Sequence, residues 1–262
     1  MTQRYFIELA YKGTHFHGWQ IQPNAVSAQE CLEKALSVIT RETTVVTGAG
    51  RTDTGVHASY FVAHFDSTRS NLDHPDFVYK LNSFLNKDIT VFSISKVHSE
   101  AHARFDAVSR TYQYHLNLRK DPFSTETSWH FFRQPDLDKM NEASRILFEY
   151  TDFTSFSKLH TEVKTNNCKI YCAEWTQSGS NIVFTVKADR FLRNMVRALA
   201  GTILEVGTGK IDLMHFRNII ELKDRCEAGL SVPAQGLFLT DIEYPEGIFD
   251  RYSESESRTF RQ

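Results

Sequence analysis

The sequence has few of the residues that hold a chain together covalently. Among its 262 residues there are only four cysteines. They are scattered along the chain, which is typical of a reducing compartment rather than of a disulfide-stabilised secreted protein. Cys168 and Cys172 have a spacing close to that of metal ligands, but a zinc site needs about four ligands. No second Cys/His pair is suitably placed, so we expect neither a disulfide framework nor a metal site.

Long apolar runs are also missing. The apolar stretch from Ile182 to Val186 ends at a lysine, far short of the ~18 apolar residues of a membrane span. The first residues, Met1 to Tyr5, lead directly into a strand-like pattern, so we expect no signal or transit peptide. These features predict a cytoplasmic protein that does not associate with a membrane.

Neither sign of charge is in excess. Lys and Arg number 30 and Asp and Glu 32, which gives a net charge of −2. This balance argues against a protein that coats nucleic acid non-specifically, although a local basic groove is compatible with it. Aromatic residues make up 13% of the chain, which suits β-sheet packing and leaves rings available for stacking on bases.

The hydrophobic pattern predicts the same element order twice. In the first half we expect strands over 4–11, 43–47, 56–65 and 89–97, and helices behind the capping box Ser27–Glu30 and over 76–85. In the second half we expect strands over 110–118, 168–177, 182–188 and 238–244, and helices over 137–148, 191–206 and, additionally, 211–222. The order β-α-β-β-α-β is typical of ferredoxin-like domains.

We therefore predict an α+β fold of two ferredoxin-like, split β-α-β halves with a catalytic groove between their sheets. The first half is expected over residues 1–105 and the second over 106–247. The Ser/Glu-rich end, 248–262, is expected to be a disordered tail. A groove between two similar halves is suited to an extended polymer.

The most unusual segment is TGAGRTDTGVHA, from Thr47 to Ala58. Its glycines permit tight turns, but their spacing fits neither a dinucleotide fingerprint nor a P-loop. Arg51 and Asp53 lie two residues apart, and an aspartate beside an arginine stays ionised at neutral pH. Such a carboxylate can serve as nucleophile or general base; alternatively, the pair only holds the loop.

Asp53, Thr54 and Gly55 also spell the triplet of aspartic proteases. That chemistry needs two carboxylates that share a proton, and a single triplet would supply them only in a homodimer. The triplet follows Gly-Arg-Thr rather than an apolar strand, so the protease interpretation is disfavoured.

The segment GAGRTDTGVHA closely resembles the active-site loop of the tRNA pseudouridine synthase A family, usually GRTDAGVHA. The resemblance covers nearly the whole chain and keeps the order of the family's motifs: Gly18–Gln22, Ser27–Glu30, His102–Ala107, Arg110–Tyr114, Asp152–Phe156, Phe191–Arg197 and Pro233–Leu237. Thr54, Ala28 and Val232 replace the usual Ala, Val and Ala, and none of these changes removes a reactive group.

This resemblance implies two ferredoxin-like halves, a homodimer, and no cofactor or metal. The implied reaction converts uridine to pseudouridine at positions 38 to 40 of the tRNA anticodon arm. Asp53 corresponds to the catalytic aspartate, and Arg51 to the basic residue that helps extrude the nucleotide or holds the aspartate. Tyr112 corresponds to the tyrosine that packs on the uracil, and Arg197 to the basic residue that pairs with the aspartate. Whether Asp53 attacks the sugar, attacks the base or removes a sugar proton stays open.

Further residues are candidates by their position. Arg190, Arg193 and Arg197 fall on one face of the expected helix, where they either contact RNA phosphates or form a solvated surface. Arg104 and Arg110 are further candidates for contacts with the RNA backbone. Tyr112 and Tyr114 alternate on a strand and so share a face; for Tyr114 we expect core packing. His57 is expected to fill a packing position.

Two other functions compete with the synthase. One is a non-catalytic RNA-binding module that keeps the fold, and the other is a hydrolase that uses the same aspartate. The presence of Asp53, Arg51, Tyr112 and Arg197 together favours the enzyme over the binding module.

Overall fold

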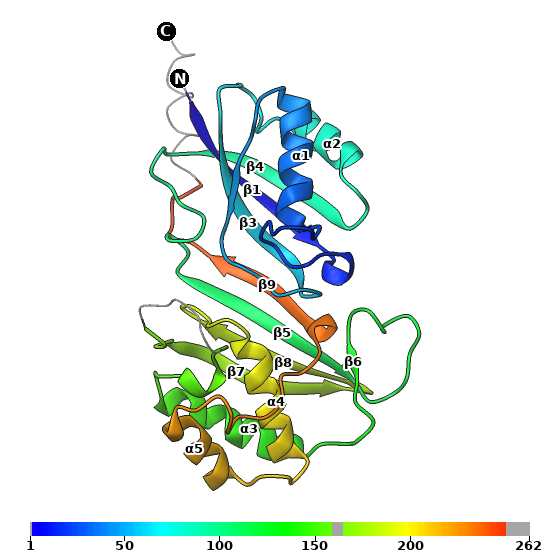
Figure 1. The fold of residues 1–262 in the computed structure, drawn as a ribbon, viewed down its shortest axis with the longest axis vertical. Helices are drawn as coiled ribbons and strands as arrows, with labels where there is room; N and C mark the ends of the chain where they lie inside the picture. The colour runs from blue at the N-terminus through cyan, green and yellow to red at the C-terminus, as the bar shows by residue number, and fades with distance from the viewer. Residues whose placement is uncertain (1, 159–164, 250–262) are drawn as a thin grey trace. The chain divides into compact units, whose positions relative to one another are not determined.

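The structure is a computed structural model that describes residues 2–158 and 165–249 (Figure 1). It shows a mixed α/β chain whose strands pair mostly in antiparallel fashion. The described residues form two compact units, 2–108 with 240–249 and 109–158 with 165–239. The second unit thus ends earlier than the expected boundary at 247, because the last strand continues into the first unit.

The first unit contains every element expected for the first half. These are β1 (Gln3–Tyr11), α1 (Ala28–Thr40), β2 (Val46–Gly48), β3 (His57–Ser67), α2 (Pro75–Phe84) and β4 (Ile89–Val97). Strand β1 pairs with both β3 and β4, and β2 pairs with β3. The strand order within this unit is therefore β4-β1-β3-β2, with a buried β1 at its centre.

Local signals account for α1 and for the short β2. Ser27 caps α1 by accepting a hydrogen bond from the amide of Glu30 at 3.2 Å. The Glu30 carboxylate pairs with Lys34 instead of returning to the cap. Strand β2 begins later than the expected residue 43, because side chains of α1 bind the amide of Thr44, before the strand, and that of Val46, its first residue. The Ser37 hydroxyl accepts a hydrogen bond from the amide of Thr44 at 3.0 Å, and the Glu33 carboxylate accepts one from the amide of Val46 at 2.8 Å.

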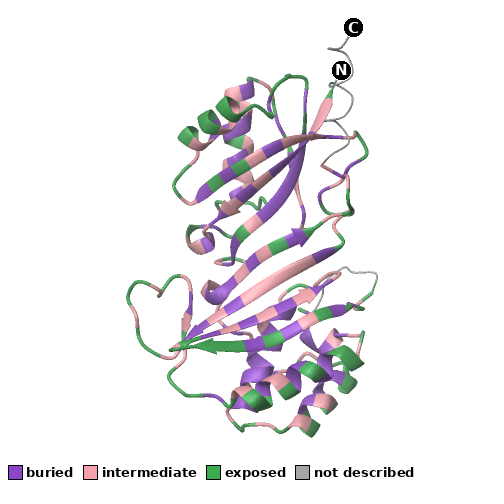
Figure 2. Ribbon diagram, turned by 180° about the vertical axis from the view of Figure 1, so that it is seen from behind, coloured by how far each residue is buried: buried purple, intermediate pink, exposed green. Residues whose placement is uncertain are grey.

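The second unit is built around an antiparallel sheet in the order β5-β8-β7. Its elements are β5 (Ser109–Asn117), β6 (Trp129–His130), α3 (Leu137–Ile146), β7 (Ile170–Ser178), β8 (Asn181–Ala188), α4 (Met195–Gly207) and α5 (Leu213–Leu222). The short β6 pairs with β5 in parallel. Helix α4 is buried along almost its whole length (Figure 2). The last strand, β9 (Leu237–Glu243), starts in this unit and ends in the first.

Helix α4 corrects one expectation. It begins at Met195 and not at residue 191, because Asn194 takes a left-handed conformation with φ 67°. The side-chain amide of Asn194 donates a hydrogen bond to the Ser231 hydroxyl at 2.6 Å, which holds the chain in this turn. Arg190 and Arg193 therefore lie before the helix, and the predicted helical face of three arginines is wrong; only Arg197 lies on α4.

The start of the expected tail is packed. Ile248 is buried, and the Phe249 ring meets Phe6 edge-on with the centroids 5.6 Å apart. Residues 250–262 lie outside the described residues, so the expectation of disorder stays a prediction for them. Within 2–158 and 165–249, no helix is both long and apolar enough to cross a membrane.

Candidate active site

The segment singled out from the sequence forms the loop between β2 and β3. The amide of Ala49 donates to the carbonyl of Val62 at 2.8 Å, and the amide of Val56 donates to the carbonyl of Asp53 at 3.1 Å. The second bond closes a turn that contains Gly55 in a left-handed conformation, φ 78°. Asp53 is half-buried at the start of this turn, whereas Arg51 is exposed.

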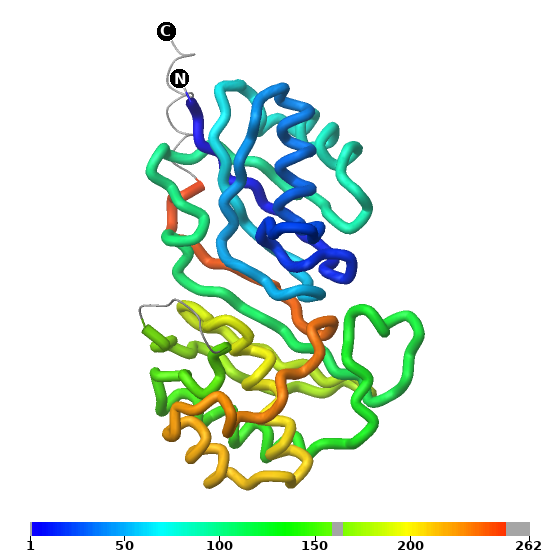
Figure 3. Tube along the Cα trace, in the orientation of Figure 1, coloured from blue at the N-terminus to red at the C-terminus, as the bar shows by residue number. Residues whose placement is uncertain are grey.

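The connection between β1 and α1 packs along this loop (Figure 3). The amide of Gly55 donates to the carbonyl of Phe16 at 3.2 Å. The amide of Gly13 donates to Nδ1 of His57 at 2.9 Å. His57 is buried, as expected for a packing residue, and the bond to Gly13 additionally fastens the connection to the first residue of β3.

Close backbone approach requires glycine at two positions of this connection. A Cβ atom on Gly13 would lie closer than 3.0 Å to the carbonyl of Val56, and one on Gly18 closer than 3.0 Å to the carbonyl oxygen of Thr52. Gly18 also has φ 84°, in the region that favours glycine. The backbone on either side of Asp53 is therefore in direct contact with the β1–α1 connection.

A buried aromatic cluster supports the loop. Tyr11, Trp19 and Phe61 are at most 3% exposed. The rings of Trp19 and Phe61 have centroids 4.2 Å apart, and Tyr11 lies 5.9 Å from Trp19. The indole of Trp19 also occupies the space that a side chain on Gly48 would need. Because interiors of this kind are close-packed, the cluster forms a rigid base for the loop.

In the second unit, the two tyrosines of β5 differ in environment. Tyr114 is completely buried, and its hydroxyl donates to the carbonyl of Pro233 at 2.9 Å. Burial raises the pKa of Tyr114, so its hydroxyl stays protonated, and the expectation of core packing is confirmed. Tyr112 is half-buried, and its ring meets Phe191 edge-on with centroids 5.1 Å apart.

Arg197 is held by the segment that Tyr114 also contacts. Its Nε atom donates to the carbonyl of Val232 at 2.8 Å, and its own carbonyl accepts from the Val232 amide at 3.2 Å. The positive charge of Arg197 opposes the rise in the pKa of Tyr114 that burial causes. Arg197 is half-buried, so its guanidinium is oriented by protein contacts.

The other predicted basic residues occupy both units. In the first unit, Arg104 is exposed, and its guanidinium lies 5.6 Å from the centre of the Phe105 ring. In the second, Arg110 donates to the carbonyl of Asp189 at 2.9 Å, and the Asp189 carboxylate accepts from the amide of Arg190 at 2.7 Å. Arg51, Asp53 and Arg104 thus belong to the first unit, and Arg110, Tyr112, Arg190, Arg193 and Arg197 belong to the second.

Three residues of this region were not predicted from the sequence to have a role of their own: Tyr11, Gly18 and Thr52. Gly18 lies in a motif that carried the resemblance, which was the only signal for it. No sequence signal pointed to a contact between Tyr11 and Thr52, because the two lie 41 positions apart.

The described residues contain no group of three or more His, Cys, Asp or Glu side chains that could hold a metal ion. Burial raises the pKa of the Cys168 thiol to about 12. Cys168 is therefore a protonated thiol at neutral pH.

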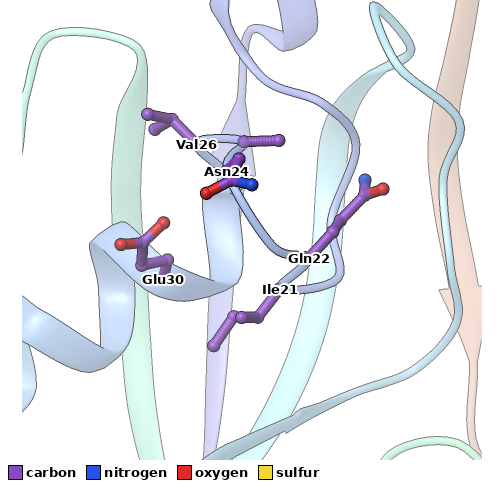
Figure 4. A pocket seen from close by; sticks show the side chains of 6 residues that line it. Ile21, Gln22, Asn24, Val26 and Glu30 are labelled. Atoms are coloured by element: carbon purple, nitrogen blue, oxygen red, sulfur yellow. The ribbon is translucent and has the colours of Figure 1, made fainter.

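A pocket of about 290 Å³ lies at the start of α1 (Figure 4). It is lined by Ile21, Gln22, Asn24, Ala25, Val26 and Glu30. Of the described residues that line it, none belongs to the predicted site. Its volume is at the lower limit for small-ligand sites, and we assign no function to it.

Comparison with known proteins identifies the family. The family described as tRNA pseudouridine synthase matches residues 9–106 and 150–245. The tRNA pseudouridine synthase A of Bacteroides fragilis is 57% identical over 250 residues, which cover 95% of this chain and 99% of that protein. The protein of the same name from Porphyromonas gingivalis is 50% identical over 94% of this chain and 99% of its own. That of Francisella tularensis subsp. mediasiatica is 37% identical over 95% and 97%.

Proposed function

Because the chain belongs to the tRNA pseudouridine synthase A family, we propose that it acts at positions 38 to 40 of the anticodon arm, with Asp53 as its catalytic group. Family membership makes the chain an isomerase that converts uridine in tRNA to pseudouridine. The positions and the catalytic residue are our proposal.

The observation that carries the assignment of Asp53 is its place on a firmly held loop. Isomerisation must break the N1–C1′ bond, turn the base and form a C5–C1′ bond, while a proton leaves C5 and one is gained at N1. No electrons are exchanged with a redox partner, so the reaction needs no redox cofactor. A single carboxylate can assist by attacking the sugar, attacking the ring or removing a sugar proton. Each of these roles needs a carboxylate held at a defined position.

The other site residues are proposed to act around this carboxylate. The target base must leave its stack, at a cost of a few kcal/mol, and an aromatic platform such as Tyr112 returns ~1–3 kcal/mol. The edge-on contact with Phe191 supports this role because it orients the Tyr112 ring. Arg51 helps extrude the nucleotide or holds Asp53, and Arg197 pairs with Asp53. Four further arginines are proposed to contact the RNA backbone: Arg104, Arg110, Arg190 and Arg193.

We also propose that the two units are the ferredoxin-like halves and that the catalytic groove lies between their sheets. The β4-β1-β3-β2 order of the first unit and the β5-β8-β7 order of the second support the first part of this proposal. The resemblance to the family further implies a cytoplasmic homodimer, and we propose that both subunits contact one tRNA. Light scattering that shows a stable monomer at micromolar concentration would contradict the homodimer.

The function is tested by replacing Asp53 with asparagine, which keeps the volume and removes the charge. Turnover is measured as release of tritium from uridine labelled at C5 in tRNA. We expect Asp53→Asn to abolish turnover and to keep tRNA binding, because binding energy comes mainly from phosphate contacts. Asp138→Asn, at an exposed aspartate of α3, is the matched control and should behave as the wild type.

A rate for Asp53→Asn within about tenfold of the wild type would show that Asp53 is not the catalytic group. If wild-type protein binds tRNA but releases no tritium, it is an RNA-binding module and not an enzyme. Mapping pseudouridines in tRNA from a strain that lacks this protein tests the positions: the proposal requires their loss at 38 to 40.

A further inference from the structure

A hydroxyl pair lies directly next to the proposed catalytic residue. Oγ1 of Thr52 is 2.8 Å from the hydroxyl of Tyr11 and accepts a hydrogen bond from the amide of Trp19 at 3.1 Å. One side-chain atom of the loop is thus bonded to the end of β1 and to the β1–α1 connection. Thr52 precedes Asp53 by one residue, so these bonds act on the backbone that carries the carboxylate.

The Tyr11 hydroxyl is held in a fixed position by the packing of its ring. Tyr11 is 3% exposed, and its ring packs on Phe16, Trp19 and Phe61 with centroids 6.4, 5.9 and 5.6 Å away. A ring packed on several sides cannot change rotamer without opening the core. The hydroxyl can therefore hold Thr52 without moving with it.

The loop needs such a restraint because it is rich in glycine, which leaves its backbone flexible. Gly50 has no atom within 4 Å of the position of a Cβ, and glycine restricts the backbone least of all residues. On the C-terminal side, the backbone carbonyl of Asp53 accepts a hydrogen bond from the amide of Val56 at 3.1 Å. The Thr52 hydroxyl and this turn thus restrain the backbone on both sides of the carboxylate.

We propose that Thr52 and Tyr11 are positioning residues of this enzyme, which hold Asp53 in its reactive orientation through their hydroxyl–hydroxyl bond. This inference rests on the proposed function, in which Asp53 is catalytic. Neither hydroxyl is assigned a contact with the substrate; both act through the placement of Asp53. A misplacement of about 1 Å can lower a rate by roughly a hundredfold, so losing one of several restraints should cost about ten- to hundredfold.

The alternative is that the bond contributes only to stability, and β1 offers a matched control. Tyr5 lies on the same strand, is completely buried, and its hydroxyl donates to the carbonyl of Arg69 at 3.0 Å. Tyr5→Phe and Tyr11→Phe therefore remove the same group from similar surroundings. Only the second removes a bond to the loop of Asp53.

The experiment compares Tyr11→Phe, Thr52→Val and Thr52→Ser with Tyr5→Phe, by steady-state tritium release from tRNA. Thermal unfolding identifies variants that remain folded at the assay temperature. We expect Tyr11→Phe and Thr52→Val to lower kcat by about ten- to hundredfold with KM for tRNA unchanged. Thr52→Ser keeps the hydroxyl and should restore kcat to within about threefold of the wild type. The double variant Tyr11→Phe/Thr52→Val should be no slower than Thr52→Val, because Thr52→Val already removes the bond that Tyr11→Phe removes.

Two results would overturn the inference: a kcat of Tyr11→Phe equal to that of Tyr5→Phe, or a Thr52→Ser variant as slow as Thr52→Val. Asp53→Asn assayed in parallel separates the two levels of the proposal. If Asp53→Asn is inactive while Tyr11→Phe is fully active, Asp53 is catalytic and only the positioning role fails. If Asp53→Asn is active, the proposed function itself fails.

Discussion

Gly18→Ala is predicted to slow the enzyme strongly, because the added methyl group displaces the backbone beside Asp53. Gly18 has φ 84°, and an added Cβ would lie closer than 3.0 Å to the carbonyl oxygen of Thr52. It would also lie 3.2 Å from the carbonyl carbon of Thr52 and 3.3 Å from that of Asp53. The new methyl group thus meets backbone atoms and not the end of a flexible side chain, so the peptide between Thr52 and Asp53 has to move.

The expected effect has two parts. The left-handed conformation costs an alanine roughly 1–2 kcal/mol of stability. Relief of the clash requires a displacement on the order of 1 Å at the backbone of Asp53, which corresponds to a loss of roughly a hundredfold in rate. The affinity for tRNA should change little, because it depends mainly on phosphate contacts elsewhere.

Alanine variants at two other glycines distinguish the loss of stability from the loss of rate. Gly179 in the β7–β8 turn has φ 59° and no atom within 4 Å of an added Cβ; Gly179→Ala should therefore lose stability but keep its rate. Gly50 lies in the same loop as Asp53, also has no atom within 4 Å, and does not have a positive φ; Gly50→Ala should keep both. The assays are single-turnover tritium release with enzyme in excess and thermal unfolding.

A folded Gly18→Ala variant that reacts as fast as Gly179→Ala would contradict this prediction. In that case the backbone around Asp53 either tolerates the displacement or is not part of the reacting site. A loss of rate in Gly50→Ala equal to that in Gly18→Ala would also refute it, since the effect would then not depend on the contact with Thr52.

The remaining predictions concern two tyrosines and a buried histidine. Tyr112→Phe should keep most tRNA binding but lose much of the single-turnover rate, and Tyr112→Ala should also lose ~1–3 kcal/mol of binding; a wild-type rate in Tyr112→Phe would remove the hydroxyl from the mechanism. Tyr114→Phe should keep its rate but lose about 1 kcal/mol of stability, because the bond to Pro233 is lost; a larger loss of rate than in Tyr112→Phe would overturn the assignment. Burial lowers the pKa of His64 to about 4, so the unfolded chain binds a proton that the folded chain excludes. The free energy of unfolding should therefore fall as the pH drops from about 6.5 to 4. Chemical denaturation should show a smaller pH dependence for His64→Gln, and an unchanged one would contradict this explanation.

Short-range patterns in the sequence predicted much of the fold. The expected strand over 89–97 coincides with β4 (Ile89–Val97), and the expected strands over 168–177 and 182–188 correspond to β7 and β8, which a turn at Gly179 joins. The predicted cap Ser27 begins α1. In each case the signal is local: alternation, a turn residue or a capping side chain acts within a few residues, and neighbouring contacts do not reverse it.

The features that the sequence could not predict depend on contacts between residues that lie far apart in the chain. Helix α4 starts late because Asn194 bonds to Ser231, and β2 starts late because side chains of α1 bind the amides of Thr44 and Val46. The motif around Asp53 was recognisable, but its support by Tyr11 was not, since 41 positions separate Tyr11 from Thr52. A hydrogen bond between distant residues leaves no periodicity in the sequence. Only the packing of the β1–α1 connection on the loop decided which groups hold Asp53.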